Sequence, residues 1–387
     1  MRRLLLLFLI AFTSTSLAQA IGITHGPYIC DMDSTSVTIV WTTDKPGLSW
    51  LELAPDDTDH FYGEERAKYF DTRQGRRVVL DSVHQVRIEG LTPDTRYRYR
   101  IFTKEALEYK WGDYVLYGDV AASAVYQHDP YMFKTFPSGK RDMNFLMLND
   151  IHENADVLTK MIKEVDFSKV DFVVMNGDMV SNIEDENELL NGVMDSLVNI
   201  CATSIPVFLN RGNHETRGKY ADQLMRYFPN SSGEFYRLKR QFGIDFLFID
   251  SGEDKPDSDI EYSEIADFDN YRLQQARWLR QLQQTKQVGT HPLIVFSHVP
   301  PTLDTWHGPK HLVQTIVPEL NKMNVTVMLS GHLHRYAYQE PNQIIHFPNL
   351  ANANQSYLMC HIHDNILSID YVDLNPKENR QFTYPLK

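Results

Sequence analysis

The spacing of apolar residues divides the chain into two segments with different periods. From about Ile21 to Pro137, apolar and polar positions alternate, so that Val37, Ile39 and Trp41 fall on one face of an extended segment. Turn residues separate such segments, as at 92–94, and no helical pattern interrupts them. Residues 21–137 are therefore predicted to form an all-β sandwich.

From about Asp142 the pattern changes to apolar runs of strand length that alternate with helical spacing. Continuous apolar runs are typical of strands in a sheet that is covered on both faces. The predicted strands cover 145–148, 172–175, 207–209, 246–249, 293–296 and 325–329. The predicted helices cover 155–165, 186–200, 273–284 and 311–323. Residues 142–387 are therefore predicted to form an α/β domain.

Small polar clusters directly follow five of the predicted strands. Carboxyl ends of strands in open α/β sheets line binding sites, so we expect these clusters to meet at one edge. Their candidate metal ligands are Asp150, His152, Asp178, Asn213, His298, His332 and His334.

Oxygen and nitrogen donors without thiolate suit Mn, Fe or Zn. Seven ligands are too many for one tetrahedral zinc, but with one bridging carboxylate they supply four to each of two divalent ions. Two neighbouring metals can share a bridging hydroxide and hold both the attacking and the leaving oxygen of an in-line displacement. Their positive charge would attract a phosphate to an otherwise acidic protein.

The ordered set D-x-H, G-D, G-N-H-E, H and G-H-x-H resembles that of the calcineurin-like metallophosphoesterase superfamily, over essentially all of 142–387. The resemblance implies a four-layer αββα sandwich. It implies one metal held by Asp150, His152, Asp178 and His334. It places the second metal with Asp178, Asn213, His298 and His332, so that Asp178 bridges. It also implies that His214 contacts the phosphate and helps to protonate the leaving oxygen, which makes Asp178 and His214 the candidate catalytic residues.

The first segment adds a second resemblance. Residues 91–97 are similar to the tyrosine corner of a fibronectin type III domain, and such a domain before the catalytic one resembles the layout of purple acid phosphatases. Those enzymes carry a tyrosine that binds ferric iron three positions after the Gly-Asp aspartate, where this chain has Ser181. We therefore expect Mn, Fe(II) or Zn and not a ferric–divalent centre.

Several residues beside the ligand motifs are candidates for contacts with substrate. Arg211 and Arg335 could bind phosphate oxygens or form ion pairs at the surface. His307 and Tyr336 lie in loops after ligand motifs and are candidates for shaping the pocket. Glu215 is expected to orient the imidazole of His214.

The N-terminus indicates a compartment. Arg2 and Arg3, an apolar run of nine residues from Leu4 to Phe12, and the small residues Ala18 and Ala20 are typical of a cleaved secretory signal. We predict a signal peptide over 1–20, cleavage near Ala20, and a secreted or periplasmic protein. The apolar run is too short to span a bilayer, and no later stretch is long and apolar enough.

Composition narrows the function classes further. Hydrophobic residues at 42% and charged residues at 23% are typical of a globular protein, and a net charge of −13 disfavours nonspecific nucleic-acid binding. Cys30, Cys201 and Cys360 are too few for a disulfide framework, so we expect buried thiols.

The leading hypothesis is a secreted dinuclear-metal phosphoesterase that hydrolyses a small phosphomonoester by attack of a metal-bridging hydroxide. A monoester is favoured because the layout resembles that of acid phosphatases. Phosphodiester hydrolysis at the same site is one alternative. The other is a non-catalytic module, tethered by its β domain, that only binds phosphate groups. Substrate identity, metal identity and oligomeric state stay open at this point.

Overall fold

The structure is a computed structural model that describes residues 19–124, 128–140, 142–302 and 306–386. Almost all of the predicted signal peptide, residues 1–20, lies outside this described part. Among the described residues, no helix combines the length and the apolar character needed to cross a membrane.

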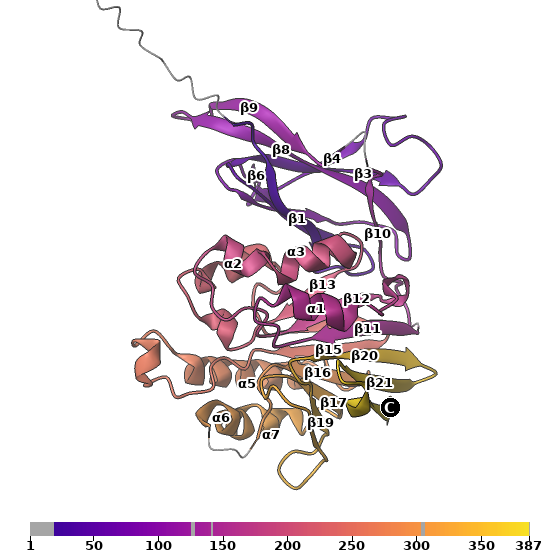
Figure 1. Ribbon diagram of the computed structural model, residues 1–387, viewed down its shortest axis with the longest axis vertical. Helices are drawn as coiled ribbons and strands as arrows, with labels where there is room; N and C mark the ends of the chain where they lie inside the picture. The colour runs from indigo at the N-terminus through magenta and orange to yellow at the C-terminus, as the bar shows by residue number, and fades with distance from the viewer. Residues whose placement is uncertain (1–18, 125–127, 141, 303–305, 387) are drawn as a thin grey trace, which may run out of the picture.

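Eight of the first ten strands form a sandwich of two antiparallel sheets, at the top of Figure 1. One sheet has the order β1 (Ile23–Cys30), β2 (Val37–Thr43), β7 (Val83–Ile88). The other has the order β10 (Tyr131–Lys134), β8 (Arg96–Tyr109), β3 (Gly47–Pro55), β4 (Ala67–Phe70), and β9 (Val115–Ala122) also pairs with β8. The short strands β5 (Thr72–Arg73) and β6 (Arg76–Arg77) pair with each other.

The alternating pattern read from the sequence builds the core of this sandwich. Ile39 and Trp41 of β2 are fully buried with Tyr99 of β8. The indole Nε1 of Trp41 donates to Thr103 Oγ1 at 2.9 Å, so its polar atom is satisfied inside the core. The backbone N–H of Thr92 donates to the hydroxyl of Tyr97 at 3.0 Å, the contact expected of a tyrosine corner. The predicted all-β sandwich is confirmed.

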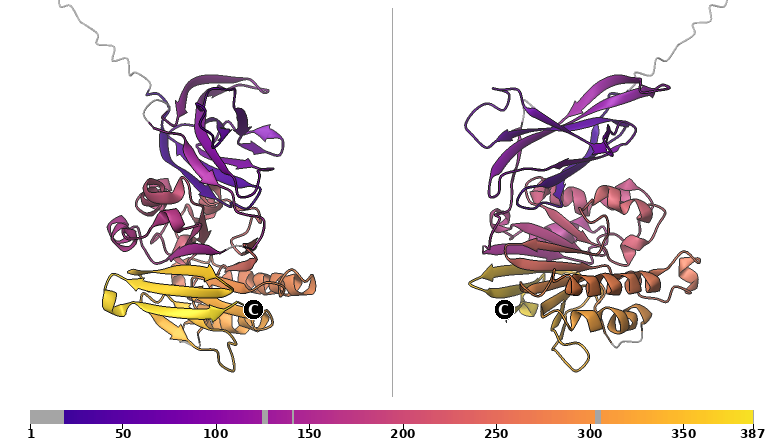
Figure 2. Two further views of the ribbon diagram at one scale, coloured as in Figure 1. Left: turned by 90° about the vertical axis from the view of Figure 1, so that its right-hand side faces the viewer. Right: turned by 180° about the vertical axis from the view of Figure 1, so that it is seen from behind.

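The rest of the chain contains two mixed six-stranded sheets that pack face to face (Figures 1 and 2). The first has the order β13 (Val207–Asn210), β12 (Phe172–Asn176), β11 (Met143–Leu148), β20 (Ser356–His363), β21 (Ile366–Asp373), β22 (Arg380–Pro385). The second has the order β14 (Arg237–Gln241), β15 (Ile244–Ile249), β16 (Leu293–Ser297), β17 (Val325–Ser330), β19 (Asn349–Ala351), β18 (Ala337–Gln339). Buried phenylalanines fill the space between the sheets, with Phe145 against Phe172, Phe246 and Phe296.

Helices cover the outer face of each sheet, which confirms the four-layer αββα arrangement. The first sheet packs against α1 (Ala155–Ile162), α2 (Glu186–Leu190), α3 (Val193–Leu197), a π-helical turn (Val198–Ala202) and α4 (Leu224–Tyr227). The second packs against α5 (Phe268–Gln284), α6 (His307–Thr315) and α7 (Val317–Leu320).

All four predicted helices need corrected boundaries. The helix predicted over 155–165 ends at Ile162, and the one predicted over 311–323 begins earlier, at His307. The helix over 186–200 breaks between α2 and α3, where Gly192 has a φ of +81°. The helix over 311–323 breaks before α7, where Pro318 has no backbone N–H to continue the helical ladder. Helix α5 begins at Phe268 instead of 273 because the carboxylate of Asp257 accepts the backbone N–H groups of Phe268 and Asp269, at 2.9 and 3.0 Å. That cap comes from outside the helical pattern, so the spacing of apolar residues does not reveal it.

The sandwich and the second domain share buried contacts. Tyr28 of β1 is fully buried, packs on Phe228 and donates from its hydroxyl to the carbonyl of Tyr227 at 2.7 Å. The carboxylate of Asp31 accepts from Lys239 Nζ at 3.2 Å and from the backbone N–H of Ser231 at 2.7 Å. The β domain is thus held in a defined orientation by apolar and polar contacts together.

All three cysteines are free and buried, as expected. Burial raises the pKa of the Cys201 thiol to about 12, so this thiol is protonated and unreactive at neutral pH.

His84 provides a test of the sandwich core through the pH dependence of stability. Its ring is buried beside Trp41, with Nε2 2.7 Å from Thr43 Oγ1 and with Nδ1 lacking a hydrogen-bond partner. Burial lowers the pKa of His84 to about 4, whereas an unfolded histidine titrates near 6.5. The folded state thus resists protonation, so this contribution to stability is complete above pH 6.5 and declines as the pH falls toward 4.

Between pH 7 and pH 4, we expect the His84→Gln variant to lose less unfolding free energy than the unmodified protein, by on the order of 3 kcal/mol. Urea denaturation at a series of pH values measures this difference. The exposed His346 supplies the control variant His346→Gln, which should follow the unmodified protein. Parallel curves for the unmodified protein and His84→Gln would contradict the assignment.

Candidate metal centre

The seven predicted ligands all lie directly after parallel strands of the two sheets. Asp150 and His152 follow β11, Asp178 follows β12 and Asn213 follows β13 in the first sheet. His298 follows β16, and His332 and His334 follow β17 in the second sheet. Contacts between these side chains run from one sheet to the other, so the face-to-face packing brings all seven together.

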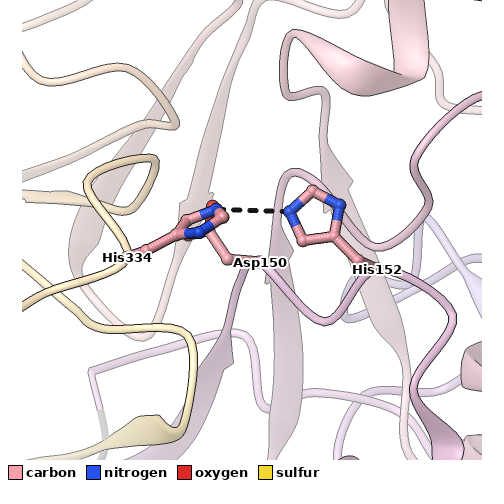
Figure 3. A group of neighbouring side chains, drawn as sticks. All are labelled: Asp150, His152 and His334. Carbon is pink, nitrogen blue, oxygen red and sulfur yellow. Dashed lines mark hydrogen bonds and ion pairs between the residues drawn. The ribbon is translucent and has the colours of Figure 1, made fainter.

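Asp150, His152 and His334 form the first group, and Figure 3 shows their side chains pointing toward one another. His334 Nε2 lies 3.1 Å from Asp150 Oδ1 and 3.3 Å from His152 Nε2. Two ring nitrogens that face each other can share only one proton, so their lone pairs and the carboxylate point into a common space.

Asp178, His298 and His332 form the second group. His298 Nε2 lies 2.9 Å from Asp178 Oδ2, and His332 Nδ1 lies 3.1 Å from Asn213 Oδ1. The other ring nitrogen of His298, Nδ1, donates to the carbonyl of Asn176 at 2.8 Å. This hydrogen bond commits Nδ1 as a donor and fixes the ring so that Nε2 faces Asp178.

Two buried atoms of the cluster indicate that it fits cations. Asp150 Oδ1 and His298 Nε2 are buried and have no hydrogen-bond partner. A buried acceptor without a partner is costly, and a bound cation would satisfy both atoms. Burial lowers the pKa of His298, but Asp178 and Asp150 outweigh this effect and raise it to about 10, which reflects a strongly negative local field. The donor set of oxygen and nitrogen completes the fit to divalent ions.

Several of the predicted ligands have a backbone conformation that residues other than glycine rarely adopt. Asp150, His152, Asp178, His332 and His334 all have positive φ, between +48° and +68°. Left-handed backbone in residues other than glycine is strained, and such strain concentrates at functional sites.

The neighbouring glycines serve mainly to make room. Only Gly177 among the three beside the ligands has a positive φ, of +85°. A Cβ at Gly212 would lie 2.3 Å from Asp178 Oδ1, and one at Gly331 would lie 2.6 Å from Asp150 Oδ2. The two carboxylates can therefore approach the backbone only because no side chain stands there.

His214 stands between the two groups. Its Nδ1 donates to the carbonyl of Ser181 at 2.7 Å, and its Nε2 lies 3.9 Å from Asp178 Oδ2. Its backbone N–H donates to Asp178 Oδ1 at 3.0 Å. The hydroxyl of Ser181 donates to Glu153 at 2.9 Å, and its carbonyl orients His214.

Glu215 does not orient His214, contrary to expectation. Its buried carboxylate accepts the backbone N–H groups of Asp178, Met179 and Gly212, at 2.9, 2.6 and 2.8 Å. Burial and the charge of Asp178 together raise the pKa of Glu215 to about 7. Glu215 therefore joins the two loops that carry Asp178 and Asn213.

The structure places three residues next to the predicted site that the sequence analysis did not identify: Arg217, Glu253 and Asp254. Arg217 Nη1 lies 3.4 Å from both ring nitrogens of His214. Glu253 holds this guanidinium with two contacts of 2.7 Å, and Asp254 Oδ2 lies 3.7 Å from His332 Nε2. The acidic residues at 250–254 directly follow β15, so the rule that picked out the other five strand ends could also have found them.

A cavity of about 640 Å³ has Arg211 and Arg217 in its wall, and Arg217 connects it to His214. Arg211 Nη2 lies 2.6 Å from Asp250 Oδ2, and the guanidinium lies 4.4 Å from the ring centre of Phe235. The remaining wall includes Tyr262, Phe268, Tyr271 and Arg277. Charged and aromatic side chains thus line this cavity.

Three other predicted substrate residues lie apart from the ligand cluster or at its edge. Arg335 is exposed next to His334. The ring of Tyr336 packs against Tyr371 and Phe382, beneath the guanidinium of Arg380. His307 Nε2 lies 2.8 Å from Asp269 Oδ1, at the first turn of α5.

Comparison with known proteins follows the same division of the chain. Residues 143–336 match the family of calcineurin-like phosphoesterases, and residues 29–127 match the N-terminal domain of purple acid phosphatases. Comparison with curated protein sequences finds no matching relative.

Among solved structures, the purple acid phosphatase PPD1 from yellow lupin seeds is similar, with a TM-score of 0.60 and 12% identity over 95% of this chain and 74% of that one. The phosphoesterase Yfce from E. coli has a TM-score of 0.30 and 14% identity over 62% of this chain and 98% of its own. TT1561 of Thermus thermophilus has a TM-score of 0.34 and 10% identity over 62% and 99%. The lupin enzyme shares the two-domain fold.

Glu215→Gln tests the role of Glu215 in joining the loops. The amide nitrogen of glutamine would face backbone N–H groups that need an acceptor, so we expect a loss of about 1–3 kcal/mol of unfolding free energy. Urea denaturation measures this loss, with Glu261→Gln on an exposed carboxylate as the matched control. Equal stability of both variants would show that Glu215 does not hold these loops.

Proposed function

The chain belongs to the calcineurin-like phosphoesterase family, and on that premise we propose that it hydrolyses small phosphomonoesters with the help of two divalent metal ions. The observation that carries the proposal is the convergence of the seven ligand side chains around two unpartnered buried atoms, Asp150 Oδ1 and His298 Nε2.

In this proposal the two groups of side chains each hold one ion. Asp150, His152 and His334 would bind the first, and Asn213, His298 and His332 would bind the second. Asp178 lies beside His298 and His214 and would contact both ions. We propose Mn, Fe(II) or Zn, because Ser181 offers no phenolate for ferric iron. When bound, such ions polarise the phosphoryl group and activate water for attack on phosphorus.

His214 would give a proton to the leaving oxygen. Its Nδ1 proton is committed to the carbonyl of Ser181, so a second proton on the ring must sit on Nε2, the nitrogen that faces the centre. Arg217 and Ser181 hold the ring from two sides, which keeps Nε2 in place.

The cavity that shares Arg217 with the surroundings of His214 would receive the leaving group. Its volume of about 640 Å³ lies within the range of small-molecule sites. Its aromatic rings favour a leaving group with a flat apolar surface, whereas Arg211 and Arg217 are already paired with Asp250 and Glu253. We therefore propose a small phosphorylated molecule as substrate and, from the N-terminal pattern, a secreted or periplasmic enzyme.

The decisive assay compares p-nitrophenyl phosphate with bis-p-nitrophenyl phosphate on the same Mn-loaded protein, with Asp178→Asn as the blank. We expect faster cleavage of the monoester and no turnover by the variant, because Asp178 lies between the two groups of ligands. Faster cleavage of the diester would instead assign the phosphodiesterase activity. Equal, negligible rates for both proteins would leave only phosphate binding and would overturn the enzymatic proposal.

His214→Ala tests the proton donor. We expect a loss of about 10²- to 10⁴-fold in kcat on an alkyl phosphate, whose leaving oxygen needs a proton. The loss on p-nitrophenyl phosphate should be much smaller, because p-nitrophenolate leaves without one. Equal losses on both substrates, at unchanged metal content, would exclude this role. The control variant His346→Ala should keep full activity.

A further inference from the structure

A second cluster of possible metal ligands lies outside the centre described above. Helix α6 begins at His307 and carries His311 one turn later, so both rings extend from one face of the helix. Asp269 stands in the first turn of α5. One ligand atom from each of these three side chains lies within 4.8 Å of the other two.

The two histidines of this cluster both face the carboxylate of Asp269, and only His307 forms hydrogen bonds with it. His307 Nε2 lies 2.8 Å from Asp269 Oδ1 and 2.9 Å from Oδ2. His311 Nδ1 lies 3.1 Å from Asp269 Oδ1, yet it is buried and has no hydrogen-bond partner. A close approach without hydrogen-bond geometry is expected when the lone pairs of neighbouring groups point toward a shared position. The two rings are nearly parallel, with their centres 5.5 Å apart.

Neighbouring residues hold Asp269 in this position. Arg272, a fully buried side chain, donates from Nη1 to Asp269 Oδ1 at 2.9 Å and from Nε to the carbonyl of Ser251 at 2.8 Å. The carboxylate of Asp257 accepts the backbone N–H of Asp269 at 3.0 Å. Carboxylate ligands of metals are commonly fixed by such outer hydrogen bonds, and Arg272 contacts only Oδ1 of Asp269, so Oδ2 has His307 as its neighbour within the cluster.

We propose that Asp269, His307 and His311 bind a zinc ion at a site separate from the catalytic pair. Two imidazole nitrogens and one carboxylate oxygen, with a fourth position open to water, form a donor set that zinc favours. Side-chain exposures of 35% for His307 and 34% for Asp269 leave a path from solvent.

The site would join the beginnings of α5 and α6, which are separate in sequence. Arg272 extends this connection toward the catalytic edge, because its Nη2 donates to the carbonyl of Glu253, the residue that holds Arg217 against His214. The zinc would therefore stabilise the wall of the cavity beside the catalytic centre without contacting the substrate.

The test counts zinc in the full chain. The protein is stripped with a chelator, reloaded with zinc, freed of excess ion by gel filtration and measured by elemental analysis. We expect the double variant His307→Gln/His311→Gln to hold one zinc per chain fewer than the unmodified protein. His363→Gln is the matched control, since that exposed ring lies between the carboxylates of Asp142 and Asp364 but outside any such cluster.

Equal zinc content in a folded double variant, as judged by circular dichroism, would overturn the proposal. If the double variant does not fold, the single variant His311→Gln replaces it, and the same loss or retention of one zinc decides. Asp178→Asn separates this result from the catalytic proposal. It should lower the zinc content of the catalytic centre and leave the difference caused by the α6 substitutions unchanged.

Discussion

Two buried carboxylates, Asp150 and Asp178, set the conditions for the whole catalytic edge of this protein. Each is almost fully shielded from water, and they lie beside the buried imidazole of His298. Burying two like charges together is unfavourable unless compensating charge stands between them. Both carboxylates accept backbone N–H groups, Asp178 from His214 and Asp150 from His332, which offsets part of the cost. Asp150 Oδ1 still lacks a hydrogen-bond partner, and a bound cation would supply the missing contact.

The strained backbone around these carboxylates follows from the same constraint. Ligands on five different strand ends can meet only if the chain turns sharply after each strand, and five of the seven ligands accept a left-handed backbone to do so. Glu215 supports these turns from behind by binding three backbone N–H groups of two loops. Without such support, the strained loops would relax and the donor atoms would separate.

A chain of contacts links this edge to the outer helices. Arg217 touches His214, Glu253 holds Arg217, and the carbonyl of Glu253 accepts from Arg272. Arg272 in turn holds Asp269 beside His307 and His311. The loop after β15 therefore connects the position of the proposed proton donor with the packing of α5 against α6. The β-sandwich contacts the α/β domain through Tyr28, which packs in the same apolar cluster as α4.

The sequence by itself determined the two-domain order, the six central strands of the α/β domain and the set of residues after them, because apolar periodicity and local spacing are encoded along the chain. The alternating segment that contains Trp41 and the tyrosine-corner segment that contains Tyr97 likewise predicted the β-sandwich. Only the tertiary structure decided that Glu215 binds the backbone and not His214, and that Tyr336 packs against β21 and β22. It also decided that Asp257 starts α5 early and that Arg217 reaches His214 through Glu253. These outcomes depend on which side chains meet across different strands and loops. No spacing along the chain specifies such meetings, because they arise from the packing of one sheet against the other.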